Sequence, residues 1–292
     1  MKFGIFPLLG GPAATPEFIS GLGPAVEERG FHSLWAAEHV VLFDQQDSKY
    51  PYSSDGVPPF NPDDNFLEPF SALSFIAATT TKLRLGTGIC ILPQRNPVYT
   101  AKQVTDLDIL SGGRFDFGIG VGWLKEEFDA LGVPFDHRGA RANECIDIAR
   151  TLWSDGVSQY NGKFYTLPEC HQYPKPVQKP HPPIYVGGES WAALRRVAEY
   201  GDGWFGFNIL PDRVLQGFDM LQPLLAEHGR TMVEMEIFAS PYTTPCTLDM
   251  VKQYQDAHVD QIILLAASAN LDDLKRELDS LSSELLEPAK GL

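Results

Sequence analysis

The side chains best suited to acid–base chemistry are Glu38 and His39, which stand together after a predicted strand, 31–35. Histidine is the side chain that changes charge closest to neutral pH, and a neighbouring carboxyl group completes an acid–base pair. A histidine that is simply satisfied within the core is the alternative. The position at the end of a strand favours a functional role, so we assign Glu38 and His39 as candidate catalytic residues.

Few other residues could take a direct part in catalysis. The sequence contains neither a Gly-x-Ser-x-Gly nucleophile elbow nor a Walker phosphate loop. Its four cysteines lie far apart without a Cys-x-x-Cys pair, which argues against a metal site and against a disulfide framework. A site with so little chemistry of its own indicates that a bound cofactor carries the reaction.

Glycines occur where such a cofactor could lie. Gly88, followed by Ile89, interrupts the apolar strand 83–92, and Gly120 and Gly122 follow the next predicted strand. Glycine weakens a strand and often marks the close approach of a ligand or of another backbone segment; a bulge or a tight bend is the alternative. We assign these four residues to cofactor binding, because a flat ring could rest against bare backbone.

A second glycine pair could hold a phosphate. Gly187, Gly188, Glu189 and Ser190 lead from a strand into a predicted helix, 190–200, and so offer free backbone N–H groups at a helix N-terminus. The Glu189 carboxylate would have to point away from the phosphate. A simple turn with a helix cap is the alternative, but barrels often bind phosphate on late loops.

Aromatic residues could enclose the same ligand. Trp123 either walls the cofactor ring or packs on the rim of the fold. Tyr50, Tyr52, Tyr160 and Tyr165 lie in two irregular segments, where they either line a substrate cleft or pack the loops down. Their character suggests an apolar or aromatic substrate.

Short apolar runs alternate with amphipathic helices along the whole chain. Eight such strands predict a single (β/α)₈ TIM barrel over 1–292, with a doubly wound sheet as the alternative. The predicted strands are 3–6, 31–35, 83–92, 115–119, 184–186, 203–207, 234–239 and 261–265. The insertions 40–67 and 156–183, after the second and fourth strands, are expected over the active-site face.

Composition excludes several classes of function. A net charge of −15 argues against binding to nucleic acids and to anionic membranes. No apolar run reaches 18 residues, and no signal-peptide pattern opens the chain. We therefore expect a cytoplasmic protein with a small-molecule substrate.

Five motifs resemble the bacterial luciferase-like monooxygenase superfamily. They are LGTGICILPQRNP (85–97), LDILSGGRF (107–115), GIGVGW (118–123), YVGGES (185–190) and LRRVAEYGDGW (194–204). The resemblance covers about residues 1–210, and beyond them it extends only to the general barrel. Within the superfamily the chain looks most like the oxidoreductases that depend on deazaflavin coenzyme F420.

This resemblance implies a cofactor at the carboxyl ends of the strands and a non-prolyl cis peptide bond at Gly88-Ile89, behind the ring. It places Glu38 and His39 by the reactive carbon and residues 187–190 at the phosphate. It also implies hydride transfer between F420 and an organic substrate, a homodimer, and possible service by a flavin or F420 reductase.

The cofactor remains open between F420 and FMN. FMN-dependent relatives often carry a phosphate-binding tyrosine between the arginines that match Arg138 and Arg141, and here Gly139 and Ala140 stand there. This difference disfavours FMN. The alternatives are an FMN-dependent monooxygenase that uses oxygen and a non-catalytic barrel that stores flavin.

Overall fold

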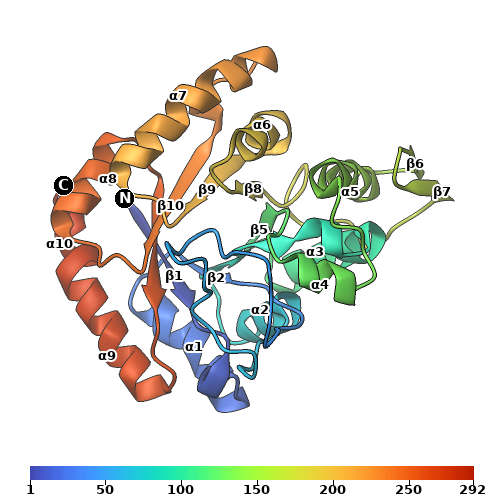
Figure 1. Ribbon diagram of the computed structural model, residues 1–292. Helices are drawn as coiled ribbons and strands as arrows, with labels where there is room; N and C mark the ends of the chain where they lie inside the picture. Colours follow the sequence, from blue (N-terminus) through green and yellow to red (C-terminus); the bar gives the residue numbers. More distant parts are fainter.

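The computed structural model describes residues 1–292, and its centre is a closed barrel of eight parallel strands surrounded by helices (Figure 1). The (β/α)₈ prediction is confirmed. The barrel strands are β1 (Lys2–Pro7), β2 (Ser33–Ala36), β3 (Arg84–Thr87) with its continuation β4 (Cys90–Ile91), β5 (Phe115–Gly120), β8 (Ile184–Gly187), β9 (Gly203–Phe207), β10 (Glu236–Tyr242) and β11 (Gln261–Ala266).

Helices follow the strands on the outside of the barrel. They are α1 (Pro16–Glu28), α2 (Pro69–Ala77), α3 (Pro97–Leu110), α4 (Lys125–Ala130), α5 (Arg138–Trp153), α6 (Trp191–Tyr200), α7 (Pro211–Glu227), α8 (Leu248–Asp256), α9 (Leu271–Leu281) and α10 (Glu287–Ala289). Several begin where a capping side chain accepts a backbone N–H. Thr15 caps α1, Asn96 caps α3 and Ser190 caps α6. None of the helices combines the length and apolar character needed to cross a bilayer.

The third strand is split by a bulge. Gly86 pairs with Asp116 of β5, and the next paired residue, Cys90, lies opposite Ile119. Three residues of the third strand therefore face two of β5, which is the definition of a bulge. The extra residue turns the chain out of the ladder at Gly88 and Ile89, whose peptide bond is cis.

The barrel interior is filled largely by rings. Trp35 packs edge-on against Tyr185 and tilted against Phe205, with ring centroids 5.9 and 5.2 Å apart. Phe6, Phe238 and Ile263 complete this buried cluster. Because these side chains fill the barrel interior, a ligand can bind only at an end of the barrel and not within it.

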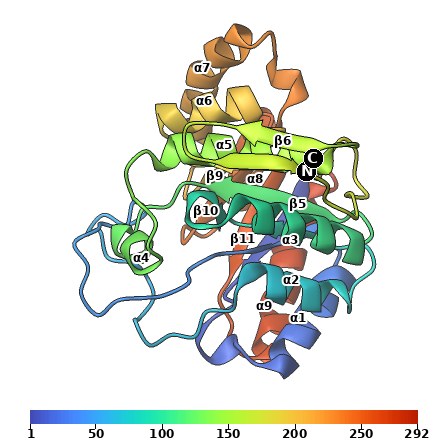
Figure 2. The same ribbon diagram turned by 90° about the vertical axis from the view of Figure 1, so that its right-hand side faces the viewer.

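The prediction that 156–183 lies over the active-site face is wrong. This segment follows α5, and a chain that leaves a helix of the barrel returns to the amino end of the next strand. Gln178 accordingly donates to the carbonyl of Phe115, the first residue of β5, at 2.6 Å. Within the segment, β6 (Ser158–Asn161) and β7 (Thr166–Cys170) form a hairpin that packs on the outside of α5 (Figure 2).

The other insertion lies where it was expected. Residues 37–68 contain no helix or strand beyond one isolated bridge between Phe66 and Gly10. Figure 2 shows this loop at the same end of the barrel as α4. Since α4 follows the carboxyl end of β5, the loop covers the carboxyl ends of the strands.

Candidate active site

A cavity of about 710 Å³ opens at the carboxyl ends of the strands, beneath the loop 37–68. Its walls combine strand ends, the loop and the start of α7, and half of the lining residues are hydrophobic. All residues that the sequence assigned to catalysis or cofactor binding lie on this cavity: Glu38, His39, Gly88, Ile89, Gly120, Gly122, Trp123, Gly187, Gly188, Glu189 and Ser190. The structure thus brings together residues from the ends of four strands, β2, β3, β5 and β8.

The glycines serve a different purpose from the one expected. A Cβ atom at Gly120 would collide with Cδ1 of Ile89, and one at Gly187 would lie 3.0 Å from its Cγ2. Both glycines therefore make room for the Ile89 side chain, which the bulge turns toward the cavity. The surface at this point is a partly exposed isoleucine and not bare backbone.

Gly122 is required by the backbone itself. Its φ is +76°, in the left-handed region that favours glycine, and a Cβ there would lie 2.7 Å from Ile91. This turn directs the chain from β5 to Trp123, which lines the cavity. The Nε atom of Arg138, at the start of α5, donates to the Gly122 carbonyl at 3.1 Å and fixes the turn.

Glu38 is not available for acid–base chemistry. Its buried carboxylate forms an ion pair with Arg95, which also binds Glu68. It further accepts the backbone N–H of Ile91 at 2.5 Å, so it anchors the chain just after the bulge. The predicted Glu38–His39 pair is therefore wrong, because adjacent residues on an extended chain point in opposite directions.

The carboxylate beside His39 belongs to Glu127. Its Oε2 lies 3.4 Å from Nδ1 of His39, within ion-pair distance although too poorly aligned for a hydrogen bond. Glu127 is completely buried, and it accepts the backbone N–H of Val40 at 2.6 Å and the amide of Gln94 at 3.0 Å. Burial acts to raise the pKa of Glu127, but His39, Gln94 and Val40 outweigh it and hold the pKa below its ordinary value.

Sequence reasoning missed Glu127 because it lies 88 residues from His39 along the chain. The first turn of α4 carries two acids, Glu126 and Glu127, and the sequence does not show that only the second is buried. Three rings surround His39: Phe60, Phe66 and Trp123, with centroids 4.9, 5.8 and 6.0 Å from its own. With Nδ1 directed at Glu127, Nε2 is the nitrogen left for a ligand.

The turn after β8 has the form of an anion site. Gly188 has a φ of +104°, and Ser190 caps α6 by accepting the N–H of Ala193 at 3.2 Å. The remaining amides of the first helical turn have no partner within the helix. Arg213, on α7, also lines this part of the cavity.

Glu189 points away from the turn, as its position requires. It accepts the N–H of Phe207 at 2.8 Å. Burial raises its pKa to about 7, against the effect of the Phe207 amide and of Arg213. At neutral pH this carboxyl group therefore carries only part of a negative charge.

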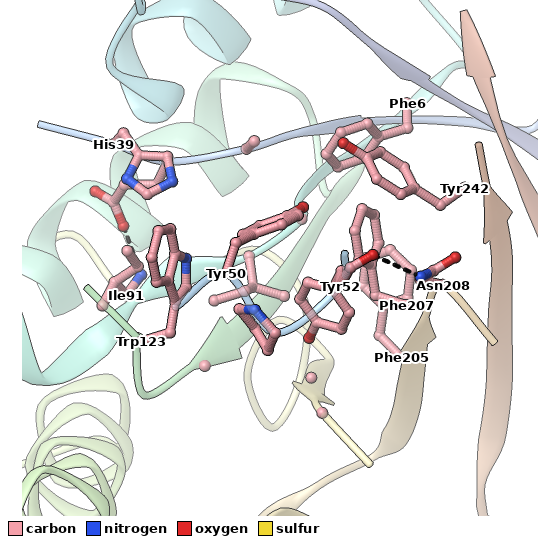
Figure 3. A pocket seen from close by; sticks show the side chains of 18 of the residues that line it. Phe6, His39, Tyr50, Tyr52, Ile91, Trp123, Phe205, Phe207, Asn208 and Tyr242 are labelled. Atoms are coloured by element: carbon pink, nitrogen blue, oxygen red, sulfur yellow. Dashed lines mark hydrogen bonds between the residues drawn. The ribbon is translucent and has the colours of Figure 1, made fainter. Parts of the chain in front are cut away.

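Two strand ends contribute residues in the left-handed conformation. Asn208, just after β9, has a φ of 53°, and Tyr242, at the end of β10, a φ of 52°. The amide of Asn208 donates to the carbonyl of Tyr52 at 3.0 Å, which ties the loop to the rim (Figure 3). Tyr242 escaped prediction because β10 was expected to end at residue 239.

The other candidate residues support the structure around the site. Arg141 is buried and donates to the carbonyls of Asp136 and Pro134, so it braces the turn before α5. Tyr160 and Tyr165 pack beside α5, outside the cavity, whereas Tyr50 and Tyr52 line it.

Comparison with known proteins identifies one family. A family model described as luciferase-like monooxygenase matches residues 1–289. An uncharacterized protein of Mycobacterium tuberculosis is 34% identical over 85% of this chain and 84% of its own length. Pyrimidine monooxygenase RutA of a Bradyrhizobium strain is 28% identical over 70% of this chain and 59% of its own. The coenzyme F420-dependent tetrahydromethanopterin reductase of Methanopyrus kandleri superposes with a TM-score of 0.76 at 17% identity, covering 98% of both chains.

Proposed function

Because the chain belongs to the luciferase-like monooxygenase family, we propose that it is an oxidoreductase that binds deazaflavin coenzyme F420 in this cavity and exchanges a hydride with a small organic substrate. The observation that carries the proposal is the position of Ile89, which shares one cavity with His39 and with the turn 187–190. These supply an apolar surface, an acid–base group and an anion site, which a planar redox cofactor with a phosphate needs.

Ile89 fits the role of a platform. Its side chain is braced by the close approach of Gly120 and Gly187 from neighbouring strands, so it cannot turn away. A rigid, partly exposed apolar surface suits the face of a tricyclic ring and fixes its height above the strand ends.

The turn 187–190 and Arg213 suit the phosphate. The free amides at the start of α6 and the positive end of its dipole favour an anion. Arg213 is the one Lys or Arg side chain on the cavity wall. Glu189 does not oppose an anion strongly, because its carboxylate is bound to Phe207 and its pKa lies at about 7.

His39 has the geometry of a proton carrier. The bound deazaflavin would supply the hydride acceptor or donor, and a substrate oxygen has to lose or gain a proton in the same reaction. Glu127 favours the tautomer that carries hydrogen on Nδ1, which leaves Nε2 free to accept the proton when an alcohol is oxidised. The same nitrogen donates it in the reverse direction.

An FMN-dependent monooxygenase is the second candidate. The relative named pyrimidine monooxygenase favours it, whereas two structural neighbours are named as F420-dependent enzymes. The absence of a tyrosine between Arg138 and Arg141 disfavours FMN, because Gly139 and Ala140 offer no hydroxyl to its phosphate.

Titration of the purified protein with each cofactor, followed by fluorescence, tests the proposal. We expect saturable binding of F420 and no saturable binding of FMN; the opposite result would establish the second candidate. The variant His39→Gln should bind F420 within about threefold of the wild type and lose at least about a hundredfold in turnover with a panel of secondary alcohols and cyclic enones. His228→Gln, on the exposed end of α7, is the matched control. Unchanged turnover in His39→Gln would remove histidine from the mechanism.

A further inference from the structure

The cavity contains an aromatic compartment, formed by Phe6, Tyr50, Tyr52, Phe207 and Tyr242. Phe207 is its centre, with ring centroids 4.5 Å from Tyr242, 4.9 Å from Tyr52 and 5.4 Å from Phe6. Tyr50 lies between this group and Trp123, 5.5 Å from Tyr52 and 5.3 Å from Trp123 (Figure 3). None of these five residues has a role in the proposed hydride transfer.

The compartment is built with unusual backbone. Between Ala239 and Tyr242 the register of β10 against β11 shifts, so that three residues of β10 advance against two of β11. This bulge places Tyr242 in the left-handed region, and Asn208 adopts the same conformation on the next strand. Such conformations are disfavoured for residues that carry a side chain, and they persist where the surroundings enforce them.

The compartment itself contains no charged side chain, which favours an uncharged ligand. No Lys or Arg side chain belongs to it, and the one arginine of the cavity wall, Arg213, lies on exposed α7. Glu38 is neutralised by Arg95. Glu189, which adjoins Tyr52, keeps its proton to a higher pH than usual because burial disfavours its charge. An anion would find no counter-charge among these five side chains. A cation would find ring faces alone, since Asp64, the remaining acid on the cavity wall, lies outside the compartment and accepts the N–H of Asn61.

One pair of polar groups remains. The hydroxyls of Tyr50 and Tyr242 lie near one another, since each affects the pKa of the other. Each hydroxyl carries one hydrogen, so this pair can donate to a ligand oxygen. A neutral carbonyl or hydroxyl oxygen is the acceptor that suits an apolar, uncharged surrounding.

We propose that the substrate is an uncharged aromatic compound that bears a hydroxyl or carbonyl group and places its ring in the aromatic compartment. Ring–ring contacts with Phe207 and Tyr52 supply most of the affinity, and the Tyr50–Tyr242 pair orients the oxygen. The inference rests on the proposed function, since it assigns the ring of the cofactor to Ile89 and leaves the aromatic compartment to the substrate.

Three probes that share one naphthalene ring test the charge preference by calorimetry: 2-naphthol, 2-naphthoate and 2-naphthyltrimethylammonium. We expect 2-naphthol to bind at least tenfold more tightly than either ion, both in the free protein and with F420 bound. Equal or tighter binding of the anion or of the cation would overturn the inference. Competition between 2-naphthol and F420 would also overturn it, because the probe would then occupy the platform.

Two variants locate the probe. Phe207→Ala should weaken 2-naphthol at least tenfold, and Tyr242→Phe should weaken it threefold to tenfold while leaving naphthalene unchanged. Tyr99→Phe, on the exposed surface of α3, is the control, and thermal unfolding verifies that each variant is folded. Unchanged affinity in both variants would show that 2-naphthol does not bind in the aromatic compartment. F420 binding without 2-naphthol binding would refute this inference alone, and 2-naphthol binding without F420 binding would refute only the proposed function.

Discussion

Nδ1 of His39 lies 3.4 Å from the carboxylate of Glu127, which reaches it from the first turn of α4. The same carboxylate holds the backbone N–H of Val40, the residue after the histidine. The ring and the chain that carries it are thus positioned by one buried acid.

Glu127→Gln should lower turnover about tenfold to a hundredfold, because a neutral amide orients the imidazole less firmly and does not stabilise its positive charge. The cofactor dissociation constant should stay within about threefold, since Glu127 does not line the cavity. Steady-state kinetics and a cofactor titration measure the two effects. Asp129→Asn, on the exposed face of α4 and paired with Lys125, should change turnover little. Equal losses in the two variants would show that α4 acts only as a support.

Gly120→Ala should weaken cofactor binding at least tenfold and destabilise the fold by about 1–3 kcal/mol, because the new methyl group occupies the place of Ile89 Cδ1. The double variant Gly120→Ala/Ile89→Val, which removes that atom, should recover much of both losses. Ile89→Val alone is the control. A double-mutant cycle on unfolding free energy and cofactor affinity detects the coupling, and strict additivity would contradict it.

Arg95→Leu should cost about 3–5 kcal/mol of unfolding free energy, because it leaves the buried Glu38 carboxylate without its partner. Adding Glu38→Gln should restore part of that loss, since an amide is cheaper to bury than a charge. Urea unfolding of the single and double variants measures the difference. If the second change gave no recovery, the ion pair would not be the cause.

The pKa of Glu189, raised to about 7 from an ordinary 4.5, predicts how stability depends on pH. Between pH 4.5 and 7 the folded protein holds more protons at this site than the unfolded chain, so the site's contribution to stability falls as pH rises. The free energy of unfolding of Glu189→Gln should therefore exceed that of the wild type by a margin that grows to about 2 kcal/mol between pH 5 and pH 8. Unfolding measured across this range tests it, with exposed Glu169→Gln as the control. A constant difference between variant and wild type would contradict the expectation.

The shifted pKa of His32 has the opposite effect on stability, which it lowers as pH falls. Burial, together with Lys2 and Arg84, lowers its pKa to about 4 from 6.5. Over pH 4–6.5 the unfolded chain holds more protons at this histidine, so stability is lost as pH falls through this window. His32→Asn should make the acid side of the stability curve flatter, measured by thermal unfolding at pH 4.5 and 6.5. An equally steep curve in the variant would assign the acid loss to other groups.

Local patterns predicted the elements well. Strand β9 has the predicted bounds, 203–207, and the helix predicted over 190–200 is α6, which begins at Trp191 because Ser190 caps it. The grouping of the candidate residues also followed from the barrel, since parallel strands bring their carboxyl ends to one face. Once eight strands were recognised, His39, Ile89 and Ser190 had to lie near one another.

The partners of those residues could not be predicted, because they depend on contacts between distant segments. Nothing near His39 in the sequence indicates Glu127, and nothing near Glu38 shows that Arg95 neutralises it. The glycines were recognised as close approaches, but the approaching group is the side chain of Ile89. The segment 156–183 was placed at the wrong end because it was counted with the preceding strand and not with α5.

Glu126 and Glu127, in the first turn of α4, bind the loop that lies over the site, and Glu127 also contacts His39. Glu127 accepts the N–H of Val40, and Glu126 accepts those of Asp47 and Ser48 at 2.7 and 3.1 Å. Residues 40–48 therefore cannot swing outward without leaving α4 or carrying it along. A movement that carried α4 along would draw Glu127 away from His39, so the contacts that fasten these residues over the site also keep the imidazole beside its carboxylate.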